Sequence, residues 1–152
     1  MSLASHVLLS DSRASLSHVT TARDANIYGY VSGALQLKMI DDAALVLAVR
    51  VAQGPAVTAR VERMDFLAPV RVGDVLHAHA DLMRTGRSSM QIRVEIYSER
   101  MGLMDFPILV GTATLVFVAV DSENKSRPLR SDASSLDEFA AEPGIAADAA
   151  RR

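Results

Sequence analysis

The chain has 152 residues, a formal net charge of −2 at pH 7, 49% hydrophobic residues and 22% charged residues. These values are typical of one globular domain with a real core, and they exclude the strongly basic surface of a nucleic-acid-binding protein. The sequence contains no cysteine. Its absence excludes disulfides, thiolate metal sites and a cysteine nucleophile, and it agrees with a reducing compartment.

Segments that direct export or membrane insertion are not expected. The N-terminal stretch MSLASHVLLSDSR has a short apolar patch without a basic region before it, so we expect no signal peptide. The longest uninterrupted apolar run, at 43–49, is far too short to cross a bilayer. We therefore expect a cytoplasmic protein that neither spans a membrane nor binds nucleic acid.

In chain order, a first strand is predicted at 14–21, where the apolar residues are only loosely patterned. The next segment, RDANIYGYVSG at 23–33, is rich in residues that favour turns. A long helix is then predicted from about Val31 to Val51, with Ser32 as its N-cap. The Gly-Pro pair at 54–55 ends this helix.

After the helix, four segments alternate between apolar and polar residues with period two, which predicts strands. These strands lie within 56–70, 74–86, 88–100 and 107–121. The last segment is almost continuously apolar, which favours a central strand covered on both faces. The elements therefore predict a strand, one long helix and then four antiparallel strands in a meander.

These elements predict a single α+β domain over 1–130, in which a curved antiparallel sheet of about five strands wraps one long helix. Such a sheet leaves an open edge or face, so we expect at least a homodimer. The remaining 131–152 form a polar, then alanine- and acid-rich tail. This tail could hold a short helix, with Ser135 as cap and Glu138 completing a capping box, followed by disorder.

Two adjacent carboxylates, Asp41 and Asp42, lie in the middle of the predicted helix. An ionised carboxylate is costly in an apolar setting unless it is paired, so such an acid is a candidate functional residue. In the other interpretation both acids lie at a solvated edge, and Lys38, about one turn away, pairs with one of them. The spacing alone leaves both interpretations open.

The stretch NIYGYVSGALQLKMIDDAA resembles the helix-start signature of hotdog-fold acyl-CoA thioesterases, in the branch of small acyl-CoA hydrolases that includes the brain-type long-chain enzyme. The family pattern is Asn, two residues, Gly, three residues, Gly-Gly, six residues and Asp. This sequence matches it in register with Asn26, Gly29, Gly33, Ala34 and Asp41. The segments VTARVERMDFLAPVRVGD, RTGRSSMQIRVEIYSE and ATLVFVAVD are also similar to the family, and the resemblance covers most of the predicted domain.

This resemblance implies a hotdog fold and hydrolysis of fatty acyl-CoA thioesters to free CoA and a carboxylic acid. Asp41 would act as general base or nucleophile. Asn26 would belong to the partner subunit's half of the site, where it holds the water or the substrate carbonyl. The family commonly builds trimers of dimers, which implies a hexamer. Coenzyme A is part of the substrate, so no cofactor is expected.

Two further groups of residues suit this chemistry. The amides of Gly33 and Ala34 at the helix start are expected to be unsatisfied and could stabilise an oxyanion. They lie ~11 Å from Asp41 along the helix axis, so such a site would form only across a subunit boundary. A turn between two predicted strands could hold the CoA phosphates through a guanidinium, hydroxyls and amides, supplied by Gly86, Arg87, Ser88 and Ser89.

Two departures from the family pattern leave another function open. Ala34 replaces the second glycine, and Ser32 stands where the family often has an aromatic residue or histidine. The alternative is a non-catalytic acyl-CoA-binding or regulatory hotdog protein. A hotdog dehydratase ranks last, because the helix has no histidine. His77 and His79 share a strand face with Asp81, but the pattern signals no complete ligand set, so no metal is expected.

Overall fold

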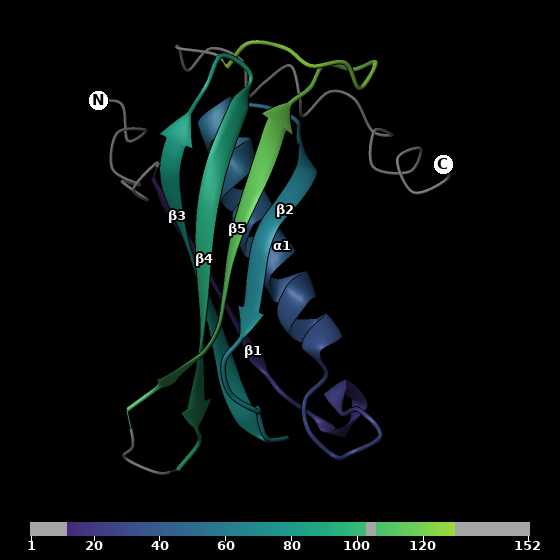
Figure 1. Ribbon diagram of the computed structural model, residues 1–152, viewed down its shortest axis with the longest axis vertical. Coiled ribbons are helices and arrows are strands. Elements are labelled where there is room, and N and C mark those ends of the chain that lie inside the picture. The colour runs from purple at the N-terminus through teal and green to yellow at the C-terminus, as the bar shows by residue number, and fades with distance from the viewer. Residues whose placement is uncertain (1–11, 103–105, 130–152) are drawn as a thin grey trace, which may run out of the picture.

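A computed structural model describes residues 12–102 and 106–129 (Figure 1). These residues form one long helix, one short 3-10 helix and five strands. The elements are β1 (Arg13–Val19), η2 (Ala22–Asp24), α1 (Gly33–Ala52), β2 (Ala56–Phe66), β3 (Asp74–Thr85), β4 (Ser89–Arg100) and β5 (Ile108–Ala119). The short helix predicted near Ser135 and Glu138 lies outside the described residues.

The five strands form one antiparallel sheet in the order β1-β3-β4-β5-β2, and α1 packs along one face of it (Figure 1). The predicted α+β domain is confirmed, and β3 pairs with β4 and β4 with β5 as expected. The meander over all four strands is wrong, because β2 pairs with β5 at the far edge of the sheet. Period two identifies a strand but does not identify its pairing partner.

The connection from β2 to β3 crosses the end of the sheet beside the start of α1. Leu67 N–H donates to Val110 O of β5 at 2.8 Å, and Val31 N–H donates to Val70 O at 2.9 Å. These bonds satisfy backbone groups of a long connection that would otherwise be left without partners. They also bring this connection against the helix start, where the predicted site residues lie.

The core lies between α1 and the inner face of the sheet. The buried residues of α1 recur three or four positions apart, as expected for one face of a helix. The strands contribute alternate residues, and the fully buried ones include Leu76, Ile92, Val94, Ile96, Leu115 and Phe117. Residues of β5 alternate between buried and half-buried over most of the strand. This interior strand is therefore covered fully on one face and only in part on the other.

The helix α1 starts at Gly33 and ends at Ala52, close to the predicted limits. Ser32 is its N-cap, as predicted. Gln53 closes the other end in a left-handed conformation, with φ of 48°. Among the described residues, no helix is long and apolar enough to cross a membrane.

A distant arginine completes the C-terminal end of α1. Arg127 donates from Nη2 to Ala52 O at 3.1 Å and from Nε to Val120 O at 2.9 Å. Gly54 permits this approach, because a Cβ at that position would lie 2.6 Å from Arg127 Nη2. The guanidinium therefore satisfies a carbonyl that the helix itself leaves unpaired.

Candidate active site

The two adjacent acids of α1 have different partners. Asp42 Oδ2 accepts a hydrogen bond from Lys38 Nζ at 2.5 Å, and this bond raises the pKa of the lysine. Asp41 Oδ1 accepts instead from Thr58 Oγ1 of β2 at 2.6 Å. Both aspartates are half-buried. The sequence spacing left open which acid pairs with Lys38. The structure shows that Asp42 forms this surface ion pair, whereas Asp41 is held by a hydroxyl of β2.

Thr58 is the candidate residue that the sequence reasoning missed. In the sequence it is one polar position of an alternating strand, 17 residues away from Asp41. No local pattern connects two residues at that separation, and the packing of β2 against α1 brings them together. The bond from Thr58 uses one lone pair of a carboxylate that offers about four, so Asp41 keeps the capacity to bind a water molecule.

Asn26 lies in a tight loop between η2 and α1. Its side-chain oxygen Oδ1 accepts from Tyr28 N–H at 2.9 Å and from Tyr30 N–H at 3.3 Å. Gly29 N–H donates to Asn26 O at 3.0 Å, and Gly29 adopts a φ of +82°, which an L side chain rarely takes. Because the loop backbone uses Oδ1, the Asn26 NH₂ group is the part of the amide left to face a ligand.

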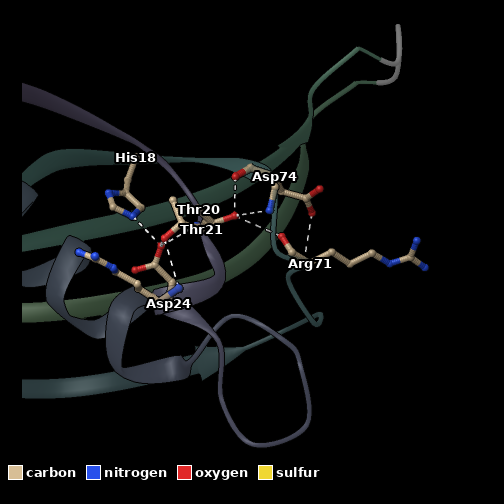
Figure 2. Close-up of polar contacts among 8 residues, drawn as sticks. His18, Thr20, Thr21, Asp24, Arg71 and Asp74 are labelled. Atoms are coloured by element: carbon tan, nitrogen blue, oxygen red, sulfur yellow. Dashed lines mark hydrogen bonds and ion pairs between the residues drawn. The ribbon is translucent and has the colours of Figure 1, made fainter.

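Asp24 ties this loop to the end of β1 (Figure 2) and, through its backbone, to the helix start. Its Oδ2 accepts from Thr21 N–H at 2.7 Å and lies 3.1 Å from His18 Nε2. Its backbone oxygen accepts from Ser32 N–H at 2.7 Å. The Thr21 backbone bond first, and then the bond with His18, hold the pKa of Asp24 below its ordinary value.

A second set of contacts in Figure 2 joins the end of β1 to the turn before β3. Thr20 is buried, and its Oγ1 donates to Asp74 O at 2.7 Å. The same hydroxyl accepts from Gly73 N–H at 3.0 Å, and Asp74 Oδ2 accepts from Arg71 N–H at 3.3 Å. These bonds hold the base of the Asn26 loop against the connection that follows β2.

At the helix start, the N-cap Ser32 leaves only one of the two predicted backbone amides without an acceptor among the described residues. Ser32 Oγ accepts from Ala34 N–H at 3.2 Å, so the expectation that both first-turn amides are unsatisfied is wrong for Ala34. Among the described residues, no group accepts from the Gly33 N–H. Gly33 is therefore the amide of the predicted pair that is open to an oxyanion.

A cavity of about 430 Å³, largely open to solvent in the single chain, lies between the Asn26 loop, the helix start and the connection after β2. Phe66 covers one side, and a Cβ on Gly33 would lie 3.1 Å from its ring, so glycine makes this contact possible. The cavity is mostly apolar, and its lining residues are Asn26, Tyr30, Val31, Gly33, Gln36, Phe66, Leu67, Ala68, Pro69 and Val70. It therefore combines the predicted residues Asn26 and Gly33 with a surface suited to a hydrocarbon chain.

The predicted CoA-binding turn joins β3 to β4. Gly86 N–H donates to Ser89 O at 2.7 Å, and Arg87 O and Ser88 O accept from Leu129 N–H at 2.9 Å and Ala119 N–H at 2.8 Å. The Arg87 side chain is exposed. The turn lies at the opposite end of the sheet from the Asn26 loop (Figure 1). One chain therefore does not bring these two groups of residues together.

The histidines of β3 have structural contacts. His77 Nδ1 lies 2.7 Å from Ser17 Oγ and its Nε2 lies 2.9 Å from Glu99 Oε2. His79 Nδ1 lies 2.8 Å from Ser15 Oγ. Within 12–102 and 106–129, no group of three or more His, Cys, Asp or Glu side chains could hold a metal ion.

Comparison with known proteins defines the class to which the chain belongs. Residues 28–104 match the family model of the thioesterase superfamily. The chain is 36% identical to the acyl-CoA thioester hydrolase YciA of Salmonella typhimurium over 110 aligned residues. This alignment covers 70% of this chain and 81% of that protein. The chain therefore belongs to the thioesterase superfamily.

Solved structures agree with this assignment. The hexameric thioesterase y2039 from Yersinia pestis has a TM-score of 0.71 and 33% identity, covering 77% of this chain and 94% of that one. The acyl-CoA hydrolase from Staphylococcus aureus, in complex with butyryl coenzyme A and coenzyme A, has a TM-score of 0.74 and 26% identity. The match covers 93% of this chain and 88% of that chain. The family and the hotdog fold predicted from the resemblance are confirmed.

Proposed function

We propose that this chain is an acyl-CoA thioesterase, which hydrolyses fatty acyl-CoA to free CoA and a carboxylic acid. The observation that carries the proposal is the difference between the two acids of α1. Lys38 neutralises Asp42, whereas Asp41, at the family's acid position, is oriented by Thr58 and has no cation as its hydrogen-bond partner among the described residues. Membership of the thioesterase superfamily supports the same reaction.

Asp41 is the proposed general base. Thr58 holds its Oδ1, and Oδ2 takes a proton from a water molecule while the water oxygen bonds to the thioester carbon. The carbonyl electron pair moves onto oxygen. When this tetrahedral intermediate collapses, the C–S bond breaks and the CoA sulfur leaves with a proton returned from Asp41. Direct attack by the same carboxylate, followed by hydrolysis of the anhydride, is the nucleophilic form of this mechanism.

Asn26 and Gly33 are the proposed donors to the thioester oxygen. The loop backbone occupies Asn26 Oδ1, so its NH₂ group is oriented as a donor. The Gly33 amide lies at the positive end of the helix dipole, which favours a developing negative charge. Ala34, which replaces the second glycine of the family pattern, is not proposed as a donor, because its amide N–H donates to the N-cap Ser32.

The complete site is proposed to lie between protomers. The turn of Gly86, Arg87, Ser88 and Ser89 is at the far end of the sheet from Asn26 (Figure 1), so CoA held by that turn would belong to a site completed by another subunit. A trimer of dimers, the assembly implied by the family, supplies such neighbours, and the Yersinia pestis relative is hexameric. Hydrolysis needs only water besides the acyl-CoA, so we propose no cofactor, and the absence of cysteine supports a cytoplasmic location.

One observation favours a second candidate function, that of a non-catalytic acyl-CoA-binding or regulatory protein. The Ser32 hydroxyl occupies the Ala34 amide, which removes one donor from the helix start. A site with fewer oxyanion donors binds substrate without stabilising the transition state as strongly. Binding without turnover would favour this function.

Thiol release from acyl-CoAs of short to long chain length tests the proposal. The chain has no cysteine, so a thiol reagent reports only released CoA. We expect Asp41→Asn to lower kcat about 10³-fold, the usual scale for loss of a general base, with an unchanged melting temperature. Asp42→Asn is the matched control and is expected to retain most activity. Equal, small losses in both variants would contradict the assignment of Asp41.

A further inference from the structure

Gln36 differs from the other buried polar side chains of the described chain. It lies on α1, three residues after Gly33, and is 4% exposed. Thr20, Asp74 and Ser98 are also buried and have hydrogen-bond partners, whereas Gln36 Oε1 has none. An unpaired buried acceptor is costly and uncommon in native proteins. The missing donor therefore has to come from outside the described residues, and a bound ligand can supply it.

The sheet makes room for this amide. A Cβ on Gly111 of β5 would lie 3.1 Å from Gln36 Oε1, closer than most such contacts allow. A larger residue at Gly111 would therefore push the amide out of its position. The helix supplies the side chain and β5 supplies the space, so the buried oxygen is part of the packing of both elements.

The position of Gln36 in the cavity suggests which chemical group it meets. Gln36 lines the same cavity as Gly33 and Asn26, and most of the other lining side chains are apolar. An apolar lining suits an acyl chain, and a buried acceptor on a side chain that lines the cavity selects a donor at a defined position. Gln36 is about 4.5 Å beyond Gly33 along the helix axis, which is close enough to reach the first carbons after a thioester held at the Gly33 amide.

We propose that Gln36 Oε1 accepts a hydrogen bond from a hydroxyl group on the acyl chain close to the thioester, so that the site prefers a short hydroxyacyl-CoA to its deoxy counterpart. The inference rests on the proposed thioesterase function, and it names the substrate class of that site. A hydroxyl satisfies the orphan acceptor, whereas a methylene group leaves it unpaired and buried.

The test compares 3-hydroxybutyryl-CoA with butyryl-CoA. In the unaltered protein we expect a higher kcat/KM for the hydroxyacyl substrate. Gln36→Met removes the acceptor at similar length and is expected to lower the ratio of the two kcat/KM values about five- to tenfold, the usual effect of one hydrogen bond. Gln36→Glu keeps an acceptor oxygen and is expected to retain the preference. Gln53→Met, at the other end of α1, is the control and leaves the ratio unchanged.

Calorimetry of both acyl-CoAs binding to the Asp41→Asn protein and to the Asp41→Asn, Gln36→Met double variant separates the thioesterase proposal from the proposed role of Gln36. If the unaltered protein hydrolyses no acyl-CoA of any chain length but Gln36→Met still removes a binding preference for the hydroxyacyl-CoA, the thioesterase proposal fails and the role of Gln36 stands. If butyryl-CoA is hydrolysed and Gln36→Met leaves the ratio of the two kcat/KM values unchanged, the role of Gln36 is overturned and the enzyme proposal survives. If neither compound binds or reacts, the role of Gln36 is overturned, and the thioesterase proposal fails with it when longer acyl-CoAs are not hydrolysed either.

Discussion

The two ends of α1 are built in opposite ways. At the C-terminal end, Arg127 satisfies Ala52 O, and Gly54 lets the guanidinium approach. At the N-terminal end, Ser32 caps the Ala34 amide, while Gly33 borders a cavity and its N–H has no acceptor among the described residues. The closed end is organised for stability, and the open end retains polar groups that a ligand can satisfy.

The two ends of α1 also differ in how far the apolar side chains around them are exposed. Around the helix start, Ile27 is 91% exposed and Tyr28 is 79% exposed, and Phe66 and Leu67 also face solvent in the single chain. Large apolar side chains gathered at one place are typical of a surface that contacts a partner or ligand. By contrast, Leu47, Ala48 and Ala52 near the helix end are fully buried. Substitutions of residues that orient the chemistry at the open end should therefore change activity, and substitutions at the closed end should change stability without changing the chemistry.

After Asp41→Asn, the largest loss of activity is expected from Thr58→Val, beside the open half of the helix. The substitution keeps the shape of the side chain and removes the hydrogen bond that orients Asp41. Since hydrogen bonds to charged groups are the stronger kind, we expect kcat to fall about 10- to 100-fold. Thiol release measures this loss. Thr112→Val on β5 is the control, and an equal loss there would show that Thr58 has no special role.

At the closed end, Arg127→Met is expected to reduce stability without changing the chemistry. It removes the donors to Ala52 O and Val120 O and costs about 2 kcal/mol, which corresponds to a melting temperature about 4–8 °C lower. Activity per folded molecule, measured well below the transition, should remain. A large loss of kcat without a change in melting temperature would contradict the view that this end of α1 serves stability rather than activity.

A smaller, pH-dependent effect is expected from Asp24→Asn at the base of the Asn26 loop. The Thr21 backbone bond and His18 hold the pKa of Asp24 below its ordinary value in the folded chain, so its ionised form stabilises the fold above that ordinary value. This contribution is lost as the pH falls through the lowered folded-state pKa. The melting temperature of the variant should therefore lie below that of the unaltered protein at about pH 5–7 and approach it in acid. A difference that grows in acid would contradict this assignment.

The smallest effect is expected from Gln36→Met without ligand. Replacing an orphan acceptor with an apolar side chain of similar length removes an unpaired buried group. We expect the melting temperature to rise by about 2 °C, which thermal unfolding measures. A clear decrease would mean that Gln36 stabilises the free protein, and it would remove the physical basis for a ligand donor at this position.

Much of the fold could be predicted because its signals are local. Ser32 and the Gly54 region mark the ends of α1 through capping and turn preferences within a few residues. The strands follow from alternation of apolar side chains. Asn26, Gly33 and Asp41 were identified through the family signature, and Asp42 paired with Lys38 at the helical spacing expected for a surface pair.

The sequence by itself therefore determined the elements, the family and the candidate acids, because each depends on contacts or patterns over a few residues. Only the tertiary structure decided that β2 lies beyond β5, that Thr58 meets Asp41, and that Gln36 is buried without a partner. These features join residues far apart in the chain. Their positions depend on how the whole helix and sheet pack together, and no local preference of the backbone or side chains specifies that packing.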